Sequence, residues 1–239
     1  MAKKAAKAKA GDATATTRSA TKAAVPTEPA WPKLSLKKSL ACRTLLEDQI
    51  LLIDNLFSAA ECKAFVNLIE QQPLELTPPK KRGEAERYNY RISYQSPSFA
   101  SALFALIAPH MPAFPYPASE AKPGQIARAA HSLNSNIRMY KYVPGQHFGQ
   151  HYDDSTRDGI SGARSEWTLL VYLSGAEDGV QGGETIFYNN DKKKTPIVAP
   201  LTRGTALLHR HGHECMLHEG SEVRAGTKYI LRSDVMFSP

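Results

Sequence analysis

The chain has 239 residues, a net charge of +7 and 42% hydrophobic residues. This length and composition suit one domain with a sizeable core. No apolar run approaches the length of a membrane span, so we do not expect a membrane-spanning protein. The three cysteines form no even framework, and neither a secretory leader nor an Asn-x-Ser/Thr acceptor is present. We therefore expect a reducing, intracellular setting.

The positive charge is concentrated at the start of the chain. Residues 1–40 hold nine lysines and arginines against Asp12 and Glu28, an excess of seven, so the remainder is neutral. Their scarcity of large apolar side chains predicts a disordered basic tail, followed by one domain over residues 41–239. Any weak contact with nucleic acid should involve this tail and not the body. We expect a cytoplasmic or nuclear protein, with a mitochondrial presequence left open.

The first ordered elements are a strand and two helices. A short strand is expected at residues 49–54, and Ser58, followed three residues later by a glutamate, predicts a capped helix start. Ser96 and Pro97 predict the start of a second helix. We expect both helices, within about residues 55–112, to buttress a sheet and to carry no chemistry.

From about residue 134 to the end, short alternating strands are separated by clusters of Gly, Asp and Asn. This pattern is typical of a jelly roll. The predicted fold class is therefore mainly β with flanking helices, an α+β chain with a jelly-roll core. Residues 155–165 form one of its long connections, and either a lid or a plain solvated hairpin is expected there.

A metal site is predicted from three residues. His151 and Asp153 are two apart, so on a strand both side chains point to the same face. With His218 they make two imidazoles and one carboxylate. On one face of an octahedral ion this set leaves three positions open, which is the arrangement of non-haem Fe(II) oxygenases. An isolated His-x-Asp is more often part of a surface strand, so the prediction depends on the residues that follow.

Lys228 makes the prediction more specific. A 2-oxoacid that chelates a metal through its carboxylate and keto oxygens projects a second carboxylate away from it. Burying that charge requires a fixed cation. Lys228 begins a plausible strand just after the one that carries His218, and it can supply that cation.

Several stretches together resemble a known family. They are residues 136–148, the strand at 167–174, the turn Gly182-Gly183-Glu184-Thr185, and the spacing of His218 and Lys228. Over about residues 45–237 they resemble the prolyl 4-hydroxylase-like branch of the 2-oxoglutarate and Fe(II)-dependent dioxygenases. The resemblance implies a double-stranded β-helix and an oxidoreductase that uses Fe(II), 2-oxoglutarate and O2, with ascorbate dependence. It also implies that Tyr142 and Thr185 contact 2-oxoglutarate.

For some of these residues a purely structural role is also possible. Tyr142 could be a core aromatic, and Thr185 could simply be a turn residue. Arg232 shares a face with Lys228 on a regular strand, so it could contact the cosubstrate or only pair near Asp234. Arg164 is a candidate substrate contact.

Other metal-binding side chains compete with this site. His209, His211 and His213 alternate and could bind zinc, but Gly212 interrupts the strand, so we expect histidines at the rim of the fold. Cys215 is the one cysteine that could lie near the metal, and a buried apolar role is expected for all three cysteines.

The substrate is less well specified than the chemistry. Collagen-type relatives usually follow the lysine with an aromatic pair and a tryptophan, and this chain does not. A prolyl or other residue of a protein is the expected substrate by resemblance. A nucleic-acid oxidative dealkylase and a non-enzymatic protein that binds nucleic acid through its tail are the alternatives.

Overall fold

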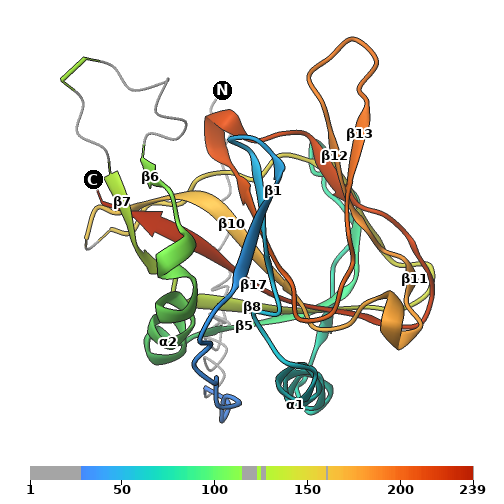
Figure 1. Cartoon of the computed structure of the whole chain (residues 1–239). Coiled ribbons are helices and arrows are strands. Elements are labelled where there is room, and N and C mark those ends of the chain that lie inside the picture. The colour runs from blue at the N-terminus through green and yellow to red at the C-terminus, as the bar shows by residue number, and fades with distance from the viewer. Residues whose placement is uncertain (1–27, 115–122, 125–127, 160, 239) are drawn as a thin grey trace, which may run out of the picture.

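The computed structural model describes residues 28–114, 123–124, 128–159 and 161–238. Two antiparallel sheets face each other and form the body of the molecule (Figure 1). In spatial order the larger sheet contains β1 (Ala41–Leu46), β2 (Ile50–Asp54), β14 (Ala206–Arg210), β10 (Arg164–Tyr172), β17 (Lys228–Phe237), β8 (Asn136–Tyr142), β5 (Tyr90–Gln95) and β3 (Glu75–Leu76). β7 (Arg128–Leu133) pairs with the end of β17 and with β6 (Ala113–Phe114).

The smaller sheet closes the barrel. Its spatial order is β13 (Pro196–Ala199), β12 (Thr185–Tyr188), β15 (His218–Gly220), β9 (His147–His151) and β4 (Arg87–Tyr88). A separate pair joins β11 (Gln181–Gly182) to β16 (Val223–Ala225). Three short 3-10 turns, η1 (Ala108–His110), η3 (Ala176–Asp178) and η4 (Gly212–Glu214), complete the regular structure of the described residues. The loop between β12 and β13 projects from the body (Figure 1).

Strand alternation divides the interior into two cores. On β10, Leu169 and Val171 point away from the smaller sheet and join the core that contains the helices. Leu170 and Tyr172 point the other way, into the core between the two sheets. Because successive side chains of a strand face opposite sides, the even-numbered positions of β10 and β17 face the barrel interior. This inner face is where the site is built.

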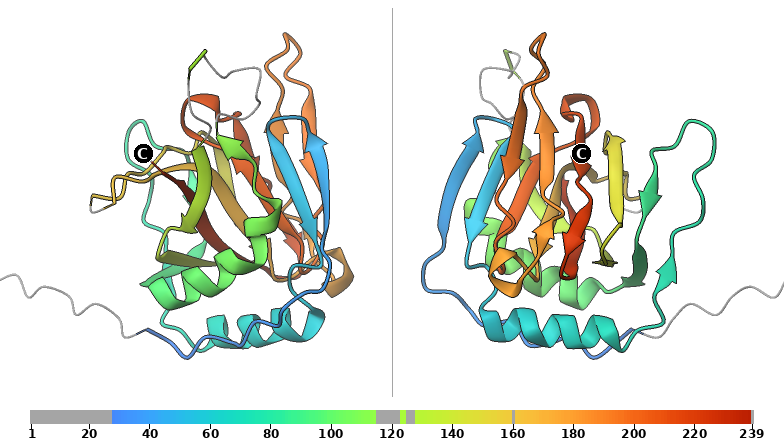
Figure 2. Two further views of the ribbon diagram at one scale, coloured as in Figure 1. Left: turned by 60° about the vertical axis from the view of Figure 1, so that its left-hand side comes forward. Right: turned by 90° about the vertical axis from the view of Figure 1, so that its right-hand side faces the viewer.

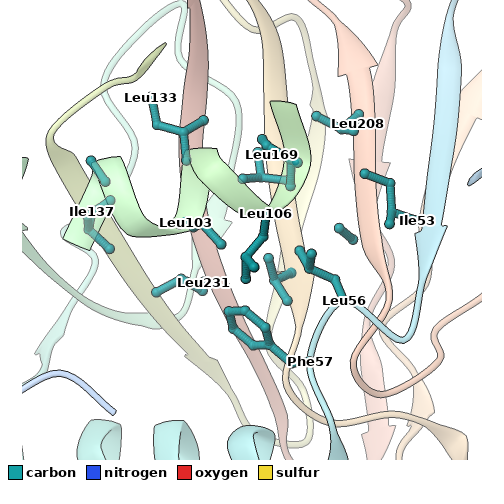
Figure 3. Packing of buried hydrophobic residues seen from close by; sticks show 14 of the residues in the cluster. Ile53, Leu56, Phe57, Leu103, Leu106, Leu133, Ile137, Leu169, Leu208 and Leu231 are labelled. Atoms are coloured by element: carbon teal, nitrogen blue, oxygen red, sulfur yellow. The ribbon is translucent and has the colours of Figure 1, made fainter. Parts of the chain in front are cut away.

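Two helices cover the outer face of the larger sheet. α1 (Ala59–Glu70) begins at the predicted capping box, in which Ser58 and Glu61 cap each other's backbone, and α2 (Pro97–Ile107) is capped by Ser96. Both lie on the same side of the molecule (Figure 2). Leu103 and Leu106 of α2 belong to the outer core with Leu169 (Figure 3). The two helices therefore flank the larger sheet, as the predicted fold class requires.

The fold class is confirmed as mainly β with flanking helices and a jelly-roll core. The strand expected at residues 49–54 is β2. The sequence did not predict β1, β3, β4, β5, β6 or β7, which extend both sheets before residue 134. Among the described residues, none of the helices is long and apolar enough to cross a membrane.

The expected boundary of the tail at residue 40 is wrong for residues 28–40. Trp31 stacks on Phe99 with ring centroids 4.3 Å apart, and Leu34 and Leu40 pack against the outer core. The backbone N–H of Ser35 donates to Glu61 over 2.7 Å. This segment has no helix or strand, yet a few apolar anchors and a helix-capping carboxylate fix it to the body. Residues 1–27, with most of the basic charge, lie outside the described residues.

We predict that Trp31→Ala lowers the free energy of unfolding by about 2 kcal/mol, because a half-buried indole loses its stacked partner and its buried area. Urea unfolding measures the difference. Leu36→Ala is the matched control, since Leu36 is 88% exposed and should change little. Equal effects from the two variants would show that the segment does not pack in solution.

Candidate metal and cosubstrate site

The three predicted metal ligands come together where β9 ends and β15 begins, within the smaller sheet. His151 is the last residue of β9, and His218 opens β15, with the two residues directly paired across the strands. Asp153 follows β9 by two residues. One donor atom from each of His151, Asp153 and His218 lies within 4.8 Å of the others.

Backbone carbonyls orient both imidazoles. The Nδ1 atom of His151 lies 2.8 Å from the Gly149 carbonyl oxygen, and that of His218 lies 2.9 Å from the Met216 carbonyl oxygen. A carbonyl oxygen only accepts, so each Nδ1 carries the proton and each Nε2 keeps a free lone pair. Burial lowers the pKa of His151 to about 4, so this ring is neutral at physiological pH.

Asp153 is buried and ionised. Its Oδ2 atom accepts from Thr168 Oγ1 at 2.8 Å and from Arg232 Nη2 at 2.9 Å. Burial alone would raise the pKa of this carboxyl, but the Arg232 guanidinium outweighs it and holds the pKa well below its usual range. The carboxylate is therefore available as an anionic ligand.

The chain after β14 fixes the turn that carries Asp153. The N–H of Gly212 donates to the Asp153 carbonyl over 2.9 Å, and the N–H of Asp153 donates to Cys215 Sγ over 3.2 Å. Gly212 has φ of +71°, and a Cβ there would lie 2.4 Å from Ser155 Oγ. The glycine that interrupts the strand thus lets the two turns approach closely.

Lys228 lies in the same cavity, behind the metal ligands. Its side chain is 2% exposed, and its Nζ donates to the Gly183 carbonyl and lies 5.3 Å from the Tyr142 ring centre. Among the described residues, no carboxylate is within ion-pair distance of it. Burial lowers the pKa of Lys228 to about 8. A buried ammonium without an anionic partner is what a cosubstrate carboxylate requires.

The Gly182-Gly183 turn makes room for this lysine. Gly183 has φ of +75°, and a Cβ there would lie 3.1 Å from Lys228 Cδ. Thr185 follows the turn, is buried, and accepts a hydrogen bond from Tyr172 Oη at 2.8 Å. That bond leaves the Thr185 hydroxyl proton free to donate into the cavity. Tyr142 and Thr185 both line the cavity with Lys228, as expected.

Two further histidines belong to the interior and not to the rim. His209 and His211 are each 2% exposed, so the rim expectation is wrong for both, while His213 is exposed. His209 lines the cavity. His211 bridges Thr168 and Ser165, with nitrogen-to-oxygen distances of 3.0 and 2.9 Å. The spacing of two between His209 and His211 could have predicted that both face the interior. The sequence analysis instead took Gly212 as an interruption of the strand.

Of the remaining predicted residues, Arg232 and Cys215 lie at the site and Arg164 does not. Arg232 Nη2 lies 2.9 Å from Oδ2 of Asp153, a predicted metal ligand, and 3.6 Å from Asp234 Oδ1. Arg164 is half exposed, lies 3.7 Å from Glu166, and lines neither the cavity nor the groove described next. Cys215 Sγ is 3.9 Å from His218 Nδ1, so it does lie beside the site.

A groove of about 670 Å³ leads from solvent to the metal ligands. Residues from 77 to 87 line one side of this groove, as a long loop at the edge of the molecule (Figure 2). Tyr140, His151 and Asp153 also line the groove. None of the described residues between 155 and 165 lines this groove. Arg157 and Arg164 form a bridge there, which favours the solvated hairpin of the two alternatives.

The residues fit a divalent cation. Two imidazole lone pairs and one carboxylate face a common point, and their other polar atoms are already hydrogen bonded. These electron-pair donors interact favourably with one another only through a cation that lies between them. The donor types are those of the 2-His-1-carboxylate triad.

Comparison with known proteins agrees with this geometry. Residues 137–233 match the model of the 2OG-Fe(II) oxygenase superfamily. A PKHD-type hydroxylase from Crocosphaera subtropica (strain ATCC 51142 / BH68) is 27% identical over 96 residues, which is 40% of this chain and 40% of that protein. The chain thus matches less than half the length of this curated relative.

Solved structures share the fold. A prolyl hydroxylase from Trichoplax adhaerens, in complex with a hypoxia inducible factor oxygen degradation domain peptide fragment, is 17% identical with a TM-score of 0.54, over 79% of this chain and 83% of that chain. A Pseudomonas putida prolyl-4-hydroxylase is 13% identical with a TM-score of 0.51, over 79% of this chain and 92% of that chain. At these identities the likeness shows the fold alone.

We predict that Arg232→Met destabilises the metal-free protein by about 3 to 5 kcal/mol, because Asp153 loses its buried partner. The double variant Asp153→Asn/Arg232→Met should recover part of this loss, since no charge is then left unpaired. Chemical denaturation of the two single variants, Arg232→Met and Asp153→Asn, and of the double variant in a chelating buffer measures the coupling. Strictly additive effects would show that the pair does not interact.

Proposed function

We propose that the chain is a member of the 2OG-Fe(II) oxygenase superfamily and acts as an Fe(II)- and 2-oxoglutarate-dependent hydroxylase of polypeptides. One observation carries the proposal. A single buried cavity has the donors of His151, Asp153 and His218 at one end and the unpaired Lys228 ammonium at the other. A molecule with one chelating end and one distal carboxylate suits both ends.

Each residue then has a defined task. His151, Asp153 and His218 hold the iron, and Lys228, Tyr142 and Thr185 hold the distal carboxylate of 2-oxoglutarate. When bound, iron and 2-oxoglutarate activate O2 and supply the oxidant for hydroxylation, while ascorbate is proposed to keep the iron reduced. Arg232 acts on Asp153, whose orientation and charge it fixes through the 2.9 Å contact.

The cavity walls exclude water from the cosubstrate. Tyr142 and Tyr172 lie beside Lys228, and Leu170 and Ile230 add apolar side chains to the inner face. In such surroundings a carboxylate-ammonium contact is stronger than in water. The protein therefore needs no side-chain general base, because its part is to bind and orient.

An extended polypeptide is the proposed substrate. The groove at the metal ligands continues into a second one of about 570 Å³, and Arg91, Arg138 and Tyr140 border both. An elongated channel suits a chain better than a compact metabolite. A prolyl or other residue would be presented to the metal, and the fold shared with prolyl hydroxylases supports this choice.

A nucleic-acid dealkylase is the second candidate, because the groove is rich in cations. Lys80, Lys81, Arg87, Arg91 and Arg138 line it. These could contact phosphates, although they suit acidic peptide side chains equally. Succinate release with a peptide panel and with alkylated oligonucleotides separates the candidates.

The setting is proposed to be intracellular. Cys42, Cys62 and Cys215 are all free thiols, as a reducing compartment requires. The domain is proposed to extend over residues 28–238, with the basic segment before it.

We predict that His218→Ala lowers succinate release by at least about a hundredfold, because one of three ligands is lost. His213→Ala is the matched control, since His213 is exposed and does not line the cavity. Release is measured with saturating Fe(II) and 2-oxoglutarate. Parental activity in His218→Ala would reject the proposed metal site.

We predict that 2-oxoglutarate affinity falls above about pH 8. Burial lowers the pKa of Lys228 to about 8, so the free protein holds the binding cation below that pH and loses it above. Each further pH unit should weaken binding by up to about tenfold. Anaerobic titration of the Mn(II)-loaded protein between about pH 6.5 and 9.5 gives the profile.

Lys228→Arg provides the control for this profile, because a guanidinium stays charged throughout the range. Its affinity should not change with pH over the same interval. If the parent and Lys228→Arg fall together, another group is responsible and Lys228 does not bind the distal carboxylate.

A further inference from the structure

A chain of buried hydrogen bonds leads away from the Asp153 carboxylate, and the proposed mechanism leaves it unused. Thr168 and Ser165 lie on β10, and His211 is the first residue after β14. These three residues are at most 2% exposed. The Thr168 Oγ1 atom lies 2.8 Å from Asp153 Oδ2 and 3.0 Å from His211 Nδ1. The His211 Nε2 atom lies 2.9 Å from Ser165 Oγ, so one imidazole connects the two hydroxyl groups.

Each bond of this chain has a fixed direction. An ionised carboxylate only accepts, so the Thr168 hydroxyl donates its single proton to Asp153. The Thr168 oxygen must then accept from His211, which places the ring proton on Nδ1. Burial lowers the pKa of His211, so the ring is neutral at physiological pH and Nε2 accepts from the Ser165 hydroxyl. All of these protons therefore point toward the predicted metal ligand.

The far end of the chain is fixed by the backbone. Ser165 Oγ accepts from the Thr156 N–H at 2.8 Å and, since its own proton goes to His211, from the Thr156 hydroxyl at 3.1 Å. The Ser165 N–H in turn donates to the Thr156 carbonyl over 2.9 Å. A network in which every member is satisfied is rigid, so His211 is held in one orientation. An apolar ring would fill the same space without the desolvation cost of these polar groups, so packing alone does not explain the histidine.

The two oxygens of the Asp153 carboxylate are used differently. Oδ2 accepts from Thr168 and from Arg232, whereas Oδ1 accepts no hydrogen bond from any described residue. The carboxylate therefore keeps Oδ1 available for a cation. A carboxylate that turned and chelated through both oxygens would occupy a coordination position that the cosubstrate needs.

We propose that His211 is a positioning residue of the metal site, which acts through Thr168 to hold Asp153 with Oδ2 engaged and Oδ1 free. The inference rests on the proposed metal site. Partners that orient a metal ligand contribute about ten- to a hundredfold to metal affinity or activity, although they do not touch the ion.

Three variants of His211 test the two halves of the chain separately. His211→Asn places an amide N–H near the position of Nδ1 and can still donate to Thr168, whereas His211→Gln reaches only the Ser165 end. His211→Phe removes both bonds. Succinate release should fall about ten- to a hundredfold in His211→Gln and His211→Phe, and should stay within about threefold of the parent in His211→Asn. If His211→Phe does not fold, the two amide variants carry the comparison.

The visible absorption of the Co(II)-loaded full-length protein reports the geometry of the metal ligands directly. It should change in His211→Gln and remain parental in His211→Asn. His213→Phe is the matched control, because His213 is exposed on the same turn, and it should keep the parental spectrum and activity.

Thr168→Val supplies a double-mutant cycle, because it removes the hydroxyl and nearly keeps the shape of the side chain. When His211 acts through Thr168, adding His211→Gln to Thr168→Val should reduce succinate release by less than about twofold further, since the connection to Asp153 is already broken.

The outcomes separate this inference from the proposed function. Equal losses in His211→Asn and His211→Gln, additive effects with Thr168→Val, or a parental spectrum in His211→Gln would overturn the positioning role and leave the proposed function standing. A parent that binds no Co(II) and releases no succinate would overturn both.

Discussion

The structure depends on one buried charge, the carboxylate of Asp153. It lies beyond the end of β9, yet it is contacted by Thr168 from β10 and Arg232 from β17. Burying an ionised carboxylate is costly unless a cation and hydrogen bonds accompany it, so its position constrains both sheets. The imidazoles of His151 and His218 approach it from the smaller sheet. A metal ion is the partner that this group of acceptors still requires.

Lys228, the second buried charge, lies on the same strand as Arg232, the partner of Asp153. Lys228 and Arg232 are four residues apart on β17 and point to the same inner face, which places their backbones about 13 Å apart. One cation binds the metal ligand and the other remains without an anionic partner. The regular rise of a single strand thus sets the distance between the metal end and the distal end of the cavity. A small dicarboxylate that chelates through one end suits that spacing.

The jelly roll and its inner residues could be predicted because strand alternation has a period of two. Alternation placed His151 and Asp153 on one face, the charge of a 2-oxoacid pointed to Lys228, and the family resemblance implied Tyr142 and Thr185. The structure brings these residues to one cavity. What the sequence missed depends on tertiary contacts. Trp31 packs although its segment has no regular structure, and His209 is buried because β14 lies between β2 and β10 in the larger sheet. The groove wall at residues 77–87 has no hydrophobic period that could reveal it.

The most direct measurement is a crystal structure of the full chain with Mn(II) and 2-oxoglutarate, prepared without oxygen. Anomalous scattering locates the metal, and the density of the cosubstrate shows which cation binds its distal carboxylate. The account predicts manganese on His151 Nε2, His218 Nε2 and the Asp153 carboxylate, with the distal carboxylate on Lys228 Nζ. Manganese elsewhere, or a distal carboxylate held by the groove arginines and not by Lys228, would contradict it.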